Sequence, residues 1–336
     1  MWYKRAEAQK RYTFFFVAAA LAAAFGGLLA AAIGKMDNMR GFRGWRWIFI
    51  LEGCLTCVVA LFCFALLPDF PEQSRWLTEE ERAFVVARLR SDQGSSAVER
   101  PITARDVANV FRDWKVFLGG FMYFGLVVPA YGYAYFAPTI IHEFGYTPIG
   151  TQLHSVPPWV GGFGSAMLVA ALSDRLKHRY LFTLIPTCVA VTGFAILLSV
   201  HHRPKLQYAA LFLVTTGLYS ALPVTLCWFT MNLGGHHRRA IGTAWQLGVG
   251  NMGGFVSTYA FLARDAPAFR PGYAISIAFA CLSAAVCAAY FCAVWAENRT
   301  RAAAAREKPA SDLNLNLTDS DKAALGDLSP EFRYQL

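Results

Sequence analysis

The side chains that could do chemistry in this chain lie inside or beside long apolar stretches of sequence. Glu52 is the only acidic residue well inside one of these stretches. A carboxylate is costly in apolar surroundings unless it is paired with a cation or takes up a proton. Glu52 is therefore a candidate proton-coupling site, and a structural ion pair with an arginine is the alternative interpretation.

Aromatic and amide side chains form a second group of candidates. Polar side chains in membrane-spanning segments usually face the bundle interior or a cavity. Aromatic walls with a few amides suit a flat, carboxylated or amide-rich ligand. The candidates for a substrate path are Tyr131, Tyr133, Tyr135, Trp228, Asn232, Trp245, Gln246 and Asn251. For each of them, core packing or helix–helix hydrogen bonding is the alternative.

A short charged loop, Ser173–Arg179, separates two apolar stretches. An aspartate at the end of one helix can pair with an arginine of a neighbouring helix, or complement a helix N-terminus. Such a contact can hold one conformation and release it in another. The loop is predicted to form a conformational clamp from Asp174, Arg175 and Arg179, and simple anchoring of basic residues at the membrane surface is the alternative.

Several glycines have the spacing of helix-packing sites. Gly250 and Gly254 are four residues apart, which lets two helix backbones approach closely. The predicted packing positions are Gly26, Gly27, Gly161, Gly250 and Gly254. Residues 248–253 also fit the pattern G-x-G-x-x-G, but they lie inside an apolar stretch and so do not predict a nucleotide site.

No cofactor, metal site or enzyme activity is expected. Cys54 and Cys57 have the spacing of a redox or zinc pair, but both lie in an apolar stretch without a second pair nearby, which favours packing. The chain has neither H-E-x-x-H nor G-x-S-x-G. An intramembrane enzyme is therefore only an alternative without a supporting motif.

The elements that must position these residues are transmembrane helices. The chain is 56% hydrophobic and 16% charged, whereas soluble chains are about 25% charged. Eight apolar stretches are long enough to cross a bilayer: 13–34, 47–67, 116–138, 157–175, 180–200, 207–229, 240–262 and 273–295. The predicted fold is an all-α polytopic membrane protein with about eight transmembrane helices.

The basic residues indicate the orientation of these helices. Of the 31 Lys and Arg residues, 23 fall in the terminal segments and alternate loops on one side, and 8 fall on the other. The basic side faces the cytoplasm in most membrane proteins, so both termini are predicted to be cytoplasmic. Nucleic acid is not an expected partner, because the basic residues are dispersed among loops and form no single face.

Four regions follow from this pattern: 1–67 with two helices, a loop at 68–115, a six-helix half at 116–296 and a disordered cytoplasmic tail at 297–336. Inside the loop, Thr78 with Glu81 and Thr103 with Asp106 have the spacing of capping boxes. Each is predicted to begin an amphipathic helix that lies against the bundle.

The charged loop resembles the D-R-x-x-R motif of the major facilitator superfamily, in the copy between helices 8 and 9. Further segments are similar to its fungal anion:cation symporter group, the allantoate, nicotinate, pantothenate and biotin permease-like carriers. These segments are Gly44–Gly53, Leu67–Pro71, Trp76–Thr78, Asp113–Lys115, Tyr123–Gly125 and Phe332–Leu336. The resemblance covers nearly the whole chain.

This resemblance implies a partial major facilitator fold, in which the eight stretches correspond to helices 5 to 12 of twelve. It implies a secondary active transporter of a small organic anion (a vitamin acid, ureide or carboxylate) in the plasma membrane, coupled to protons and working by alternating access. Helices 1 to 4 have no counterpart, which predicts either a misplaced start codon or a truncated membrane protein. The truncated form would not transport but would bind partners, sense a ligand or have no function.

Overall fold

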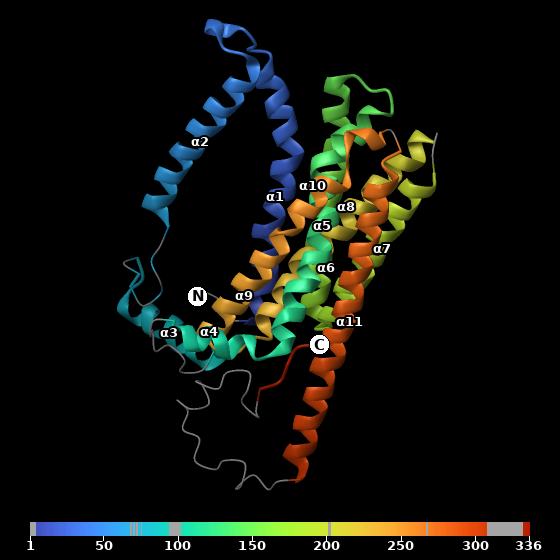
Figure 1. The fold of residues 1–336 in the computed structure, drawn as a ribbon. Coiled ribbons are helices and arrows are strands. Elements are labelled where there is room, and N and C mark those ends of the chain that lie inside the picture. The colour runs from blue at the N-terminus through green and yellow to red at the C-terminus, as the bar shows by residue number, and fades with distance from the viewer. Residues whose placement is uncertain are drawn as a thin grey trace.

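The computed structural model describes residues 5–67, 69, 71, 73–74, 76–93, 102–200, 203–266, 268–307 and 332–336, and every regular element among them is a helix (Figure 1). The long helices are α1 (Arg5–Gly34), α2 (Gly44–Leu66), α5 (Trp114–His142), α6 (Pro148–Leu176), α7 (Arg179–Ser199), α8 (Pro204–Met231) and α11 (Arg270–Glu307). The shorter ones are α3 (Glu79–Gln93), α4 (Ala104–Phe111), α9 (His236–Asn251), α10 (Gly253–Ala260), η1 (Met39–Gly41) and η2 (Ala263–Asp265).

Seven described helices are long and apolar enough to cross a membrane: α1, α2, α5, α6, α7, α8 and α11. The remaining predicted stretch, 240–262, is formed by α9 and α10, which follow each other in the same direction. The chain is therefore an integral membrane protein, as predicted, but one of its crossings is a broken helix.

The break between α9 and α10 lies at Met252, in a glycine-rich part of the sequence. Gly250 and Gly253 flank it, and glycine is the poorest helix former after proline. The Met252 N–H donates to Val249 O (3.2 Å), and the Phe255 N–H donates to Met252 O (3.1 Å). These three-residue bonds interrupt the regular four-residue ladder at this point, while Met252 keeps a helical backbone (φ −60°, ψ −20°).

The centre of the bundle is formed by α5 and α8, whose residues are mostly buried. α6 and α7 pack on α8, α1 packs on α6, and α9, α10 and α11 pack on α5. By contrast, α2 stands apart from the bundle, and Gly44 is its only buried residue.

The start of α1, residues 332–336, α3 and α4 lie at one end of the bundle, the lower end in Figure 1, which we call the terminal end. The connections around residues 35–43, 143–147, 203 and 261–269 lie at the opposite end. The crossings thus alternate in direction as the distribution of basic residues predicts. That the terminal end faces the cytoplasm stays a prediction.

The structure differs from the predicted disordered tail at 297–336. α11 continues without a break through Glu307, and Phe332–Leu336 packs against the bundle, with only 6% of Tyr334 exposed. A helix that is continuous with a membrane span needs no apolar face of its own in its last turns, so its sequence lacks the pattern that would predict it. The intervening residues, 308–331, lie outside the described part of the chain.

Both predicted capping boxes form. The Glu81 N–H donates to Thr78 Oγ1 (3.3 Å), and the Thr78 N–H donates to Glu81 Oε2 (3.1 Å). At α4, the Asp106 N–H donates to Thr103 Oγ1 (3.3 Å), and the Thr103 N–H donates to Asp106 Oδ2 (3.0 Å). α4 then packs on α5 and α9, with Val110 buried, so this cap orients the chain as it enters α5.

Replacing Thr103 with alanine is expected to destabilise α4 by about 1 kcal/mol, because the orphan amide of the first turn loses its acceptor. Hydrogen–deuterium exchange across residues 104–111 measures this loss as faster exchange. Thr103→Ser keeps the hydroxyl and should exchange like the parent chain. Equal exchange in the alanine variant would show that the cap does not hold α4.

Candidate functional site

An aromatic and amide pair lies where α5 passes the broken helix. The Tyr131 hydroxyl donates to Asn251 Oδ1 (2.8 Å), and Asn251 Nδ2 donates to Leu247 O (2.8 Å). The Tyr131 ring stacks on Tyr135, with ring centroids 5.5 Å apart. A Cβ atom on Gly254 would lie 3.3 Å from the Tyr131 ring, so glycine allows this close approach. The structure therefore brings together three of the predicted substrate-path residues.

Gln246 lies just over one turn before Asn251 on α9, and its side chain is fully buried. Neither its Nε2 nor its Oε1 has a hydrogen-bond partner within the described residues. Leaving a buried amide unpaired costs roughly 1–3 kcal/mol, so such a group favours a polar ligand or an ordered water. The neighbouring Trp245 Nε1 is also without a partner there, while its ring packs edge-on against Phe111 and Phe117, at centroid distances of 5.0 and 5.4 Å.

Tyr133 faces a different side of α5 from Tyr131. Its ring is 2% exposed and meets Trp159 edge-on at 5.2 Å, and Trp159 in turn meets Tyr219 at 4.9 Å. Among the described residues its hydroxyl has no partner, and the same holds for the Ser257 hydroxyl on α10. The alternating tyrosines thus do not share one surface, because successive odd positions on a helix are about 200° apart.

Trp228 and Asn232 lie elsewhere, at the terminal end of α8. Trp228 Nε1 donates to Gln335 O (2.9 Å), and Asn232 Nδ2 donates to the same oxygen (3.1 Å). The Gln335 N–H donates to Asn232 Oδ1 (2.8 Å). Both side chains are therefore occupied by the chain's own C-terminal segment and are not part of the Tyr131–Asn251 cluster.

Glu52 lies on α2, which stands apart from the other candidates. Within the described residues its carboxylate has no ion-pair partner, although its backbone oxygen accepts a hydrogen bond from Thr56 Oγ1 (2.7 Å). The alternative of a structural pair with an arginine therefore has no support in the described part of the chain, and a role in proton coupling stays a prediction.

The charged loop between α6 and α7 brings two of its three predicted clamp residues together. α6 ends at Leu176 and α7 begins at Arg179, with Lys177 in the left-handed conformation (φ 56°). Arg179 Nη2 donates to Asp174 Oδ1 (2.9 Å), and Nη1 donates to Ser173 Oγ (3.0 Å). The two charged side chains are only 5% and 11% exposed, whereas Arg175 is exposed.

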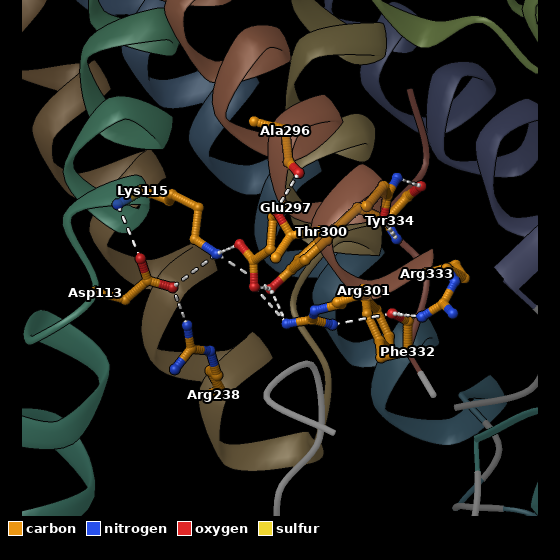
Figure 2. Close-up of polar contacts among 11 residues, drawn as sticks. Asp113, Lys115, Arg238, Ala296, Glu297, Thr300, Arg301, Phe332, Arg333 and Tyr334 are labelled. Carbon is orange, nitrogen blue, oxygen red and sulfur yellow. Dashed lines mark hydrogen bonds and ion pairs between the residues drawn. The ribbon is translucent and has the colours of Figure 1, made fainter. Parts of the chain in front are cut away.

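A larger charge network at the terminal end was not predicted (Figure 2). Asp113 caps α5 through the Lys115 N–H (3.0 Å) and pairs with Arg238 at the start of α9. Glu297 on α11 pairs with both Lys115 and Arg301. In the sequence, Asp113 immediately before an apolar stretch signals a helix cap, but nothing in the pattern signals partners more than a hundred residues away.

The predicted packing glycines differ in their surroundings. Gly250 faces the Tyr123 ring, Gly161 lies beside Phe212, and Gly27 faces the Gln152 side chain, whereas a Cβ atom on Gly26 would meet no atom within 4 Å. The tightest approach of two backbones was not predicted. A Cβ atom on Gly217 of α8 would lie 2.5 Å from Pro186 O and 2.6 Å from Ala190 N of α7.

The helical bundle, its broken crossing and its buried polar side chains define an integral membrane protein of the polytopic, all-α class. Residues 1–290 match the family described as Major Facilitator Superfamily. The chain belongs to the major facilitator superfamily, whose members are transporters and not enzymes.

Similar curated proteins are fungal transporters. The chain is 29% identical to the MFS-type transporter cnsO of Penicillium expansum, over 100% of this chain and 66% of that protein. It is 32% identical to the MFS transporter prlL of Fungal sp. (strain NRRL 50135), over 76% of this chain and 52% of that protein. It is 30% identical to the major facilitator-type transporter hxnP of Emericella nidulans, over 95% and 63%. The chain thus spans between half and two thirds of the length of these relatives.

The fold also matches a solved structure, the proton:xylose symporter XylE bound to 6-bromo-6-deoxy-D-glucose. The TM-score is 0.64 at 14% sequence identity, covering 85% of this chain and 64% of that chain. At this identity the match shows a shared fold and nothing about the ligand.

Proposed function

We propose that this chain takes part in secondary active transport of a small organic anion, coupled to protons, by alternating access. The observation that carries the proposal is the buried Gln246 amide, which has no partner among the described residues and lies on α9, the helix that also carries Asn251. Broken membrane helices with free polar groups are typical of transporter binding sites.

A carboxylate or ureide suits these groups chemically. The Gln246 amide can donate to a ligand oxygen and accept from a ligand N–H, and the Trp245 indole can donate. The stacked rings of Tyr131 and Tyr135 offer a flat apolar wall for a heteroaromatic acid. The resemblance to the fungal anion:cation symporter group supports this substrate class.

We further propose that Glu52 carries the coupled proton and that the Asp174–Arg179 pair is a clamp that breaks and reforms between conformations. The proposed setting is the plasma membrane with the terminal end in the cytoplasm. The alternative is a truncated membrane protein that binds or senses a ligand without moving it.

Replacing Gln246 with leucine tests the binding site. Chain purified in detergent is titrated with nicotinate, pantothenate and allantoate, and binding is read from intrinsic tryptophan fluorescence. Loss of hydrogen bonds to a charged ligand is expected to weaken binding by about 10- to 100-fold, corresponding to roughly 1.5–3 kcal/mol. Gln207→Leu is the matched control. Gln207 lies in the first turn of α8, at the end of the bundle away from the terminal end, and this variant should bind like the parent chain.

Uptake into proteoliposomes then separates transport from sensing. Uptake that stops when the proton gradient is collapsed supports coupled transport, and uptake that continues unchanged contradicts coupling. Binding without uptake favours the non-transporting alternative. If the parent chain binds none of the three acids, or if Gln246→Leu binds as tightly as the parent chain, the proposed site is wrong.

A further inference from the structure

Residues Phe332–Leu336 pack against helices that are distant in the sequence. Tyr334 is 6% exposed, and the five residues contact side chains or backbone of α5, α7, α8 and α11. Figure 2 shows Phe332 and Tyr334 beside Glu297 and Arg301 of α11. This packing does not depend on any substrate, so it is a feature separate from the proposed transport function.

Two asparagines recognise the backbone of this segment from two different helices. Asn298 on α11 donates to Tyr334 O (2.9 Å) and accepts from the Tyr334 N–H (3.0 Å). Asn232 at the end of α8 does the same with Gln335, donating to its oxygen (3.1 Å) and accepting from its N–H (2.8 Å). Each amide thus pairs with both polar groups of one residue, as a neighbouring strand does in an antiparallel sheet.

This arrangement requires an extended segment. In a β-strand the N–H and C=O of one residue point to one edge, and those of the next residue point to the other. Because Asn298 pairs with Tyr334 and Asn232 with the next residue, the segment lies between α11 and α8, held along both edges. Asn232 is 1% exposed and Trp228 is fully buried, so this is a buried site and not a surface contact.

The Tyr334 side chain makes the contacts that depend on the type of residue at this position. Its ring lies 4.7 Å from Lys115 Nζ and 4.9 Å from the Arg301 guanidinium, and Phe332 meets it edge-on at 5.2 Å. Its hydroxyl contacts Lys115 Nζ (3.1 Å) and Glu297 Oε1 (3.4 Å). Cations over an aromatic face contribute about 0.5–2 kcal/mol each, and here two of them converge on one ring.

The segment also reaches the Asp174–Arg179 pair. The backbone N–H of Arg179, the first residue of α7, donates to Leu336 O (2.6 Å). Arg179 is also the residue whose guanidinium pairs with Asp174. The last described residue and the charged loop are therefore joined through one arginine.

We propose that the terminal ends of α5, α7, α8 and α11 form a binding site for an extended peptide, that its occupant is the chain's own Phe332–Leu336, and that the docked segment is a latch holding these four helices together. If the segment were removed, the buried polar groups that bind its backbone would lose their hydrogen-bond partners: Trp228 Nε1, the amides of Asn232 and Asn298, and the Arg179 N–H. One extended segment of backbone thus contacts the ends of all four helices.

Hydrogen–deuterium exchange on the full chain tests the docking. Exchange across 332–336 is expected to be at least about tenfold slower than in a free peptide of the same sequence, because the N–H groups of Tyr334 and Gln335 are held in hydrogen bonds to Asn298 and Asn232. Exchange at the rate of the free peptide would overturn the proposal, whatever the behaviour of any variant.

A matched pair of variants tests the latch. Gln335→Pro removes the N–H that Asn232 accepts, while the extended conformation that proline requires of Tyr334 is already present. Gln335→Ala keeps every backbone contact. In the proline variant, exchange should rise about tenfold or more across 332–336, 176–183 and 296–303 but not in α10, and the alanine variant should match the parent chain. No change in the proline variant, or a change confined to 332–336, would contradict a latch.

Discussion

Replacing Arg179 with methionine is expected to destabilise the purified protein by about 3–5 kcal/mol, because it leaves a buried carboxylate without its partner. The side chains of Arg179 and Asp174 are 5% and 11% exposed, and Arg179 Nη2 lies 2.9 Å from Asp174 Oδ1. The substitution also removes the hydrogen bond to Ser173 Oγ. Thermal unfolding in detergent, followed by intrinsic tryptophan fluorescence, measures the effect as a lower Tm and a lower yield of folded protein.

Two further variants separate the pair from a general effect of charge. Arg175→Met, in the same loop, removes an exposed arginine and should leave the Tm within about 1 °C of the parent chain. The double variant Asp174→Asn with Arg179→Met removes both charges and should regain a large part of the lost stability. A loss of stability in Arg175→Met equal to that in Arg179→Met would show that the clamp is not the cause.

Replacing Gly217 with alanine is expected to destabilise the protein by roughly 2–3 kcal/mol, even though alanine is the better helix former. The new Cβ atom would lie 2.5 Å from Pro186 O, 2.6 Å from Ala190 N and 2.8 Å from Ala190 Cβ. Two of these are backbone atoms, which cannot rotate away, so α7 and α8 must separate along a central contact of the bundle.

Gly164→Ala is the matched control, because it lies on α6 and a Cβ atom there would meet nothing within 4 Å. It should be neutral or stabilising by up to about 1 kcal/mol through helix propensity. Size-exclusion profiles and Tm values compare the two variants. If Gly217→Ala keeps the parent Tm, the backbone contact between α7 and α8 does not limit stability.

Local features of the structure could be predicted from the sequence. The apolar stretches predicted the membrane crossings, since about 20 apolar residues are needed to span the hydrocarbon. The caps at Thr78 and Thr103 form because their partners lie three residues away. Asp174 and Arg179 form a hydrogen bond because only a tight turn separates α6 from α7, which brings the end of one helix close to the start of the next.

Contacts between distant helices could not be predicted in the same way. A single sequence shows that Trp228 and Asn232 are costly in lipid, but not whether a ligand or another part of the chain satisfies them. In the tertiary structure both side chains donate hydrogen bonds to the backbone oxygen of Gln335, more than a hundred residues away. Likewise, Gly217 was not among the predicted packing glycines, and only the approach of Pro186 shows that a side chain would not fit.

The sequence by itself determined which segments lie in the membrane, where the short helices begin and which charges meet across a tight turn, because these depend on composition and on neighbours a few residues apart. Only the tertiary structure decided which helix faces which. It divided the predicted polar residues between the cluster of Tyr131, Tyr135 and Asn251, the separate buried positions of Tyr133 and Gln246, and the site that holds Phe332–Leu336. The physical reason is that every buried polar group needs a partner, and packing alone decides which partner is within reach.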